Sequence, residues 1–139
     1  MAQSMILTNL YKSLVDMVEA HMADVAMCKT DIGDFEVRPA IGFGIPMISP
    51  VGIIGRDDEV QLTIPVVIET YGAAEPQTVQ LAALYEELRT TLKTYLQTHL
   101  TSNNVTLTSL DIDTFQPLPI GSDIAVRGLG GNLVILIKL

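Results

Sequence analysis

The chain has 139 residues, 48% of them hydrophobic and 17% charged, so it fits a single domain and is not compositionally disordered. Eight lysines and arginines against sixteen aspartates and glutamates give a formal charge of -8, which argues against binding to nucleic acid or anionic membranes because both are negatively charged. The single cysteine, Cys28, cannot form an internal disulfide, so we expect a fold held by packing in a reducing compartment.

The first half of the chain predicts one helix followed by three strands. Apolar residues recur at steps of three and four from Met5 to Met22, the period of an amphipathic helix. Strands are expected at 24–30 and 35–41, with a turn between them. The clearest strand runs from Glu59 to Glu69, where apolar and polar side chains alternate.

The second half predicts a long helix followed by three more strands. Pro76 suits the first turn of a helix, and leucines continue at helical spacing to about Ser102. A strand is expected at 105–116, with a bulge near Ser109 where the alternation changes face. The remaining expected elements are a short strand at 123–127, a tight hairpin connection at 128–132 and a final strand at 133–139.

This order of elements, α-β-β-β-α-β-β-β, predicts an α+β fold. We expect a two-layer arrangement in which a long helix and the N-terminal helix pack on a largely antiparallel sheet. One domain is expected over residues 1–139, with a projecting apolar loop or hairpin at about 41–58. The second half echoes the first in element order, without the sequence identity that would show a repeat.

The stretch IGFGIPMISPVGIIG, residues 41–55, carries no charged side chain. Glycine and proline interrupt it too often for a helix, and it is too apolar for an ordinary solvated loop. It either folds back over its own core or projects and is covered by another chain, and we favour the second because soluble monomers rarely expose so much apolar surface. The apolar C-terminal strand also suits a place between subunits. The residues expected at a subunit or partner interface are Ile41, Phe43, Ile45, Met47, Ile48, Val51, Ile53, Ile54 and Leu139.

Few groups in the sequence favour catalysis, and we expect no enzyme activity, no cofactor and no metal. Pro46 follows Gly42-x-Gly44 where a phosphate-binding loop needs another glycine, and the glycines at 128–131 do not precede a helix. His21 and His99 lie near the ends of two different helices, without a further ligand at metal spacing. Favourable placement near a helix C-terminus accounts for both histidines.

Asp111 and Asp113 are two residues apart on an expected strand, which places their carboxylates on one face, roughly 7 Å apart. Such a pair could bind a divalent cation or act as acid and base, but a solvated sheet face that resists edge aggregation is the simpler explanation. The acidic group at 57–59 is most simply the polar part of a loop, although it could also face a channel. The residues of this hypothetical acidic channel face are Asp57, Asp58, Glu59, Asp111 and Asp113.

Three segments together resemble a known family. They are FEVRPAI at 35–41, QLTIPVVIET at 61–70 after a long excursion, and LAALYEEL at 81–88 in the following helix. In this order the chain resembles the tail terminator family of tailed bacteriophages, over most of its length and through element order rather than a diagnostic motif. The resemblance implies an α+β domain that assembles into a hexameric ring, which caps the tail tube and joins it to the neck or connector.

The resemblance also implies a cellular place and a set of partners. We expect a homo-oligomer, a hexamer, that contacts tail tube and neck proteins, in the virion and, during assembly, in the host cytoplasm. No membrane is expected, and DNA would pass the acidic ring without specific binding. Other virion ring subunits, from the tail tube, the head-completion proteins or the baseplate, share these properties. The alternative from another class is a small-molecule-binding α+β domain, with Asp111 and Asp113 in its site.

Overall fold

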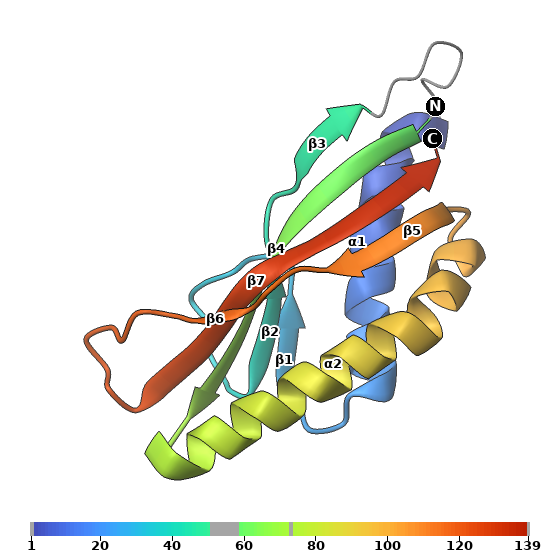
Figure 1. Ribbon diagram of the computed structural model, residues 1–139. Coiled ribbons are helices and arrows are strands. Elements are labelled where there is room, and N and C mark those ends of the chain that lie inside the picture. The colour runs from blue at the N-terminus through green and yellow to red at the C-terminus, as the bar shows by residue number, and fades with distance from the viewer. Residues whose placement is uncertain (1, 51–58, 73, 139) are drawn as a thin grey trace.

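The computed structural model describes residues 2–50, 59–72 and 74–138. Within them the chain forms two helices and a sheet of seven strands (Figure 1), which confirms the expected α+β class. Neither of these helices has the length and apolar character needed to cross a membrane. In chain order the elements are α1 (Ala2–His21), β1 (Met27–Lys29), β2 (Ala40–Phe43), β3 (Met47–Pro50), β4 (Glu59–Tyr71), α2 (Ala74–Ser102), β5 (Thr106–Ile112), β6 (Gln116–Pro117) and β7 (Val126–Lys138).

Two long strands form the middle of the sheet. β4 and β7, 13 residues each, pair antiparallel along their whole length. On the edge away from β7, β4 pairs with β2 and β3. On the edge away from β4, β7 pairs with β5 and β6. All four pairings are antiparallel. Each long strand is therefore flanked by an interrupted strand, broken at 44–46 beside β4 and at 113–115 beside β7. β1 extends the sheet beyond β2 as its parallel neighbour.

The two interruptions lie at the same level of the sheet. The Gly44 N–H donates to the Pro65 carbonyl of β4 (2.7 Å), and the Asp113 N–H donates to the Asn132 carbonyl of β7 (3.0 Å). Pro65 and Asn132 are partners in the β4–β7 register. Both halves of the chain thus run through helix, interrupted strand and long strand, so the echo in element order has a counterpart in the sheet.

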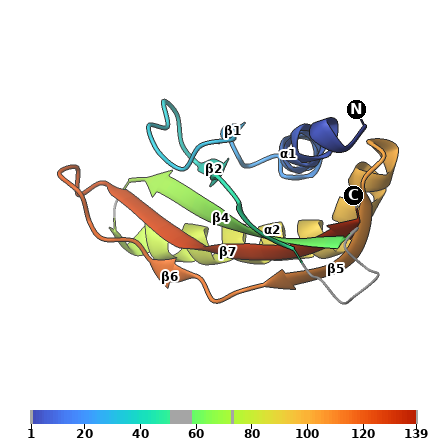
Figure 2. The same cartoon turned by 90° about the horizontal axis from the view of Figure 1, so that it is seen from above.

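One hydrophobic core lies between the two helices and the sheet. Alternate residues from Val60 to Ile68 in β4 and from Leu133 to Ile137 in β7 face this core, with the period of two that a strand imposes. α2 runs along both strands (Figure 2). Burying a leucine or isoleucine side chain fully contributes about 1.5–3 kcal/mol. The fully buried side chains include Leu10, Leu14 and Met17 of α1, Leu88, Leu92 and Leu96 of α2, Leu62, Ile64 and Ile68 of β4, and Leu133, Ile135 and Ile137 of β7.

The expected hairpin connection at 128–132 is wrong, because these residues lie inside β7. Their glycines serve close packing. A Cβ added at Gly131 would collide with the Phe115 ring, and one added at Gly128 or Gly130 would approach Leu118 to 2.8 or 2.6 Å. Glycine in a strand permits such close approach, so the segment around β6 can pack directly on β7.

The expected strand at 35–41 is also wrong over most of its length, since β2 begins only at Ala40. Phe35 instead forms a small second cluster with Ala40 and Val67. Val67 lies on β4, and Ala40 pairs with Glu69 of β4. Positions 67 and 69 alternate with the core residues Val66 and Ile68, so they belong to the opposite sheet face. An ion pair between Arg38 and Glu69 (3.0 Å) lies beside it. Residues 31–39 therefore cover part of the second sheet face instead of extending the edge.

The register of β5 on β7 shifts between Leu107 and Ser109, which confirms the expected bulge near Ser109. The strand ends at Ile112, earlier than expected, and resumes as β6. β3 lies within the stretch expected to form an apolar loop or hairpin, and it pairs antiparallel with β4. Residues 51–58, the rest of that expected feature, lie outside the described residues.

Candidate functional site

The interrupted strand beside β4 presents an exposed apolar edge. All four residues of β3 are exposed, and in the described part of the chain its only strand partner is β4. The exposed fractions are 88% for Ile45, 69% for Met47 and 50% for Ile48; we call these three residues the apolar edge. An edge strand with unpaired backbone groups and apolar side chains is a surface that a second chain can cover.

The chemistry of proline explains why the edge breaks where it does. Gly44 donates its N–H to the Pro65 carbonyl (2.7 Å), but proline has no N–H to return. The Gly44 carbonyl instead accepts a hydrogen bond from the Tyr11 hydroxyl of α1, at 2.5 Å. The helix thus replaces the missing ladder donor, and the next residue, Ile45, is exposed to solvent.

Tyr11 lies in a groove between α1 and the interruption. The groove has a volume of about 650 Å³ and is mostly apolar, with Leu7, Val15 and Ile45 in its lining. Burial raises the pKa of Tyr11 to about 12, so the phenol keeps its proton, and its donor role, at neutral pH. The groove extends the apolar surface from the edge towards α1.

The structure divides the residues expected at an interface into three groups. Ile45, Met47 and Ile48 are exposed, as an interface requires, and their contact with a partner stays a prediction. Ile41 and Phe43 are fully buried, which corrects their assignment: both side chains belong to the main core cluster of their own subunit, together with residues of α1 and α2. The remaining four residues lie outside the described part of the chain; they are Val51, Ile53, Ile54 and Leu139.

The acidic residues do not form one cluster. Asp111 is exposed on β5 opposite Val134, and Glu59 begins β4 opposite Lys138. Because Val134 also pairs with Thr63, Glu59 lies two strands and four residues away from Asp111. A single acidic channel face would have to draw on several parts of the sheet. Asp57 and Asp58 lie outside the described residues.

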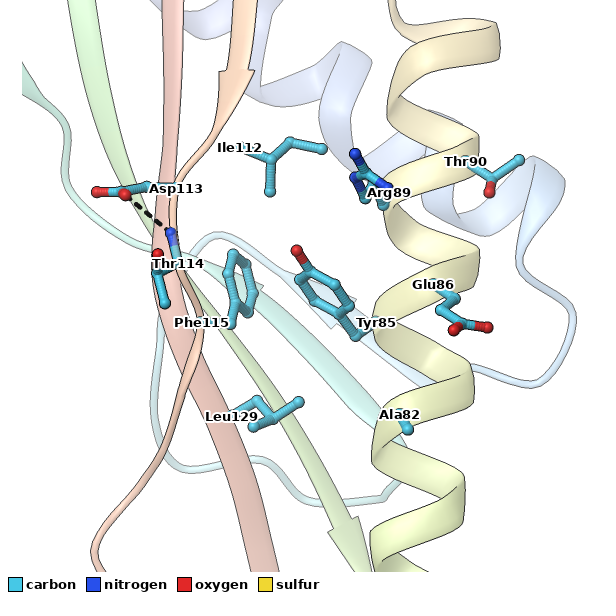
Figure 3. Close-up of a pocket in the computed structure, with 10 residues that line it drawn as sticks. All are labelled: Ala82, Tyr85, Glu86, Arg89, Thr90, Ile112, Asp113, Thr114, Phe115 and Leu129. Atoms are coloured by element: carbon cyan, nitrogen blue, oxygen red, sulfur yellow. Dashed lines mark hydrogen bonds between the residues drawn. The ribbon is translucent and has the colours of Figure 1, made fainter.

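A cleft of about 790 Å³ lies between α2 and the interruption beside β7 (Figure 3). Tyr85 of α2 and Phe115 form its apolar wall, with ring centroids 5.0 Å apart and planes inclined at 59°. Arg89 and Glu86, one helical turn apart on α2, supply a cation and an anion at its rim. The cleft therefore has an aromatic wall with charged groups beside it. Ile112 lies across from Arg89, on the sheet side of the cleft (Figure 3).

Asp113, but not Asp111, is among the residues that line this cleft. Figure 3 shows the Asp113 side chain pointing away from Tyr85 and Arg89, and its Oδ1 accepts a hydrogen bond from the Thr114 N–H at 2.8 Å. The small-molecule alternative thus has a cavity nearby, but of its two aspartates only Asp113 lines that cavity.

The structure brings together two residues that the sequence reasoning treated as separate. The Nε2 atoms of His21 at the end of α1 and His99 near the end of α2 are 3.1 Å apart. The helical spacing could have indicated that both histidines lie on the buried side of their helices, since His21 follows Val18 by three residues and His99 follows Leu96 by three. Both histidines therefore continue the buried stripes through which the two helices meet.

Comparison with known proteins gives a likeness of fold only. No protein-family model matches the chain, and no curated protein matches it. Among solved structures, a chain from the virion of a native gene transfer agent particle is similar, with a TM-score of 0.51 and 6% sequence identity. The alignment covers 94% of this chain and 92% of that chain, so the two share the arrangement of the whole domain.

Proposed function

We propose that this chain is a structural protein of a phage-like virion, which acts by assembly rather than by catalysis. Support comes from the similarity in fold to a gene transfer agent virion chain over nearly the whole of both chains. The exposed apolar edge adds a second line of support, because an assembly protein needs a surface for its neighbours. Catalysis by Asp111 and Asp113 has less support, since Asp111 does not line the nearby cleft and the Asp113 side chain points away from Tyr85 and Arg89 (Figure 3).

The more specific proposal is a tail terminator, a hexameric ring that caps the tail tube and joins it to the neck. The sequence resemblance described above favours this position in the particle. The formal charge of -8 suits a ring through which DNA passes without being held, because like charges repel at the distances of a wide bore. Copies of this chain, tail tube subunits and neck proteins are the proposed partners.

The observation that carries the proposal is the exposure of the apolar edge on a subunit with a complete core. Ile45, Met47 and Ile48 expose half or more of their surface, and none of the three belongs to the buried core. Their apolar character therefore has no evident purpose inside the subunit. Contacts between a patch on one subunit and a different patch on the next generate a ring when the rotation between subunits closes, and such contacts would cover this edge.

The mass of the purified protein by light scattering, followed by negative-stain imaging, tests the proposal. We expect six-fold particles, either of the protein alone or after addition of tail tubes from its own particle. The Ile48→Asp variant should lose assembly but keep the circular dichroism spectrum of the folded subunit. Val79→Asp is the matched control, because Val79 is 70% exposed on α2 and its replacement adds the same charge elsewhere.

Other results would favour the alternatives. Long stacked tubes formed by the pure protein would indicate a tail tube subunit, and binding only to head or baseplate parts would indicate another ring. A monomer that ignores tail tubes, and that loses binding of a small molecule on Asp111→Asn, would support the small-molecule alternative and contradict the assembly role.

A further inference from the structure

A second apolar surface lies at the end of the sheet opposite β3 (Figure 1). It is a groove of about 480 Å³ between the N-terminal part of α2, the segment that follows β6, and β7; we call it the apolar groove. Its apolar lining includes Leu81, Leu118, Ile120 and Leu129. Ile120 keeps 58% of its surface exposed, so this part of the groove is open to solvent.

Hydrogen bonds between the surrounding elements hold the groove in shape. The Leu118 N–H donates to the Gly128 carbonyl of β7 (2.9 Å), and the Leu118 side chain packs where a Cβ at Gly128 would be. The side-chain amide of Gln77, a buried residue of α2, donates to the Gly72 carbonyl (2.7 Å) and to the Ala125 carbonyl. The groove is therefore formed before any partner binds.

The apolar groove and the apolar edge both lack most of the charge that the chain carries elsewhere. The stretch 41–55, which contains the edge, has no charged side chain. Of the described residues that line the groove, only Arg127 is charged, and its guanidinium donates to the backbone carbonyls of Ile124 and Val126. Two copies of a chain with a formal charge of -8 repel each other. Their contact is therefore favoured where neither surface buries an unpaired charge.

The two surfaces are too far apart to meet within one chain. Ile48 of the edge pairs with Leu62 of β4, whereas Gly128 in the groove pairs with Glu69 of β4. The seven steps from Leu62 to Glu69 correspond to about 23 Å at 3.3 Å per residue. The edge also lies on the β4 side of the sheet and the groove on the β7 side (Figure 1). They are thus two different patches, at opposite ends and on opposite sides of the subunit.

We propose that the apolar groove of one subunit receives the apolar edge of the next copy of this chain, an inference that rests on the assembly role proposed above. A contact between two different patches repeats from copy to copy, and it forms a ring when the rotation between subunits closes. β3 is already extended and exposed in the free subunit, and the groove is already formed. Little chain is therefore ordered on contact, which favours association.

Crosslinking between introduced cysteines tests this contact on the full-length chain, in rings of the pure protein or on tail tubes. In a Cys28→Ser background, the double variant Ile48→Cys/Ile120→Cys carries one thiol on the edge and one in the groove. A short bismaleimide should join successive subunits into a covalent ladder that ends at the size of the ring. Each single-cysteine variant should stay monomeric under the same treatment. Ile48→Cys/Val79→Cys is the matched control without a ladder, because Val79 is 70% exposed on α2 but does not line the groove.

A charge placed in the groove provides a second measurement. Ile120→Asp should abolish assembly as Ile48→Asp does, and should keep the circular dichroism spectrum of the folded subunit. Val79→Asp adds the same charge outside the groove and should assemble as the wild type does. Should Ile120→Asp fail to fold, the crosslinking result decides, because cysteine is apolar and smaller than isoleucine.

The outcomes separate this inference from the assembly role. Assembled rings in which the double cysteine variant stays uncrosslinked, or rings formed by Ile120→Asp, would overturn the inference and leave the assembly role standing. Dimers of Ile48→Cys alone would show that two edges meet each other, and a crosslink from Ile120→Cys to a tail tube subunit would show that another protein fills the groove; either result would also overturn it. A wild-type chain that neither self-associates nor attaches to tail tubes would contradict the assembly role itself.

Discussion

Both interrupted strands break at the level of the Pro65–Asn132 pair, but they place their apolar side chains differently. Beside β7, the break turns Phe115 inward, where its ring packs on Tyr85 of α2 and covers Gly131. Beside β4, the break leaves Ile45 88% exposed, and Gly44 before it is held by the Pro65 carbonyl and the Tyr11 hydroxyl. The interruption beside β7 thus adds a side chain to the packing of its own subunit, whereas the interruption beside β4 presents an apolar surface.

This difference indicates which break contributes to folding and which is available for assembly. A side chain already packed within its own subunit contributes to folding stability. A side chain that stays exposed contributes little to folding, so its apolar character is better explained by contact with another chain. The following predictions test that contrast, beginning with the largest expected change in the free energy of unfolding.

Gly131→Val should destabilise the fold most. A Cβ at this position would collide with the Phe115 ring, and overpacking of this kind costs about 1–3 kcal/mol or more. Urea denaturation followed by circular dichroism measures the effect. Gly121→Val is the control with almost no expected change, because nothing lies within 4 Å of a Cβ added there. The double variant Phe115→Ala/Gly131→Val should lose less than the sum of its single changes, and strict additivity would contradict the proposed contact.

Phe115→Ala should cost about 2 kcal/mol, less than the 3–5 kcal/mol typical of fully buried phenylalanines, because Phe115 is only partly buried. Ile45→Ala, at the matching break, should change the free energy of unfolding by no more than about 0.5 kcal/mol. The same denaturation experiment compares the two. Equal losses would show that both breaks serve the core and would remove the contrast.

Tyr11→Phe removes the hydrogen bond that replaces the missing Pro65 donor, and should cost about 1 kcal/mol. A pH series adds a second test. Burial raises the pKa of Tyr11 to about 12 from 10.0, so the folded chain keeps a proton that the unfolded chain releases. The associated stability is complete below pH 10 and is lost as pH rises to about 12.

The difference in stability between wild type and Tyr11→Phe should therefore narrow between pH 10 and 12. Because the side chain is only partly buried, this narrowing should not exceed about 1 kcal/mol. A difference that stays constant across this range would show that the phenol titrates normally and is not held at the interruption. Tyr71, which is 62% exposed, provides a matched control in the variant Tyr71→Phe.

Met47→Asp should have the smallest effect on folding, within about 0.5 kcal/mol, because Met47 is 69% exposed. If the apolar edge is the assembly surface, the same change should abolish ring formation or attachment to tail tubes. Denaturation and light scattering on one sample measure both properties. Loss of stability together with assembly would show that β3 is part of the folding unit and not a separate contact surface.

The sequence alone determined the class of the fold and most of its elements. Helical and alternating periods predict α1, β4 and α2 because burial of one face repeats every 3.6 or two residues along the chain. The change of alternation near Ser109 predicts the bulge for the same reason. The stretch of uncharged residues also indicated where apolar side chains would be exposed, at Ile45, Met47 and Ile48, although its contact with a partner remains a prediction.

Only the tertiary structure decided features that depend on residues far apart in the chain. The glycines at 128–131 are typical of a turn, but they lie in β7 because Phe115 and Leu118 pack on them. Ile41 belongs to the core because its side chain lies on the sheet face against which α1 and α2 pack. His21 and His99 are 78 residues apart and meet only where α1 and α2 end together. Local sequence patterns record the face that a residue presents, whereas the neighbour that meets this face is fixed by how the elements pack.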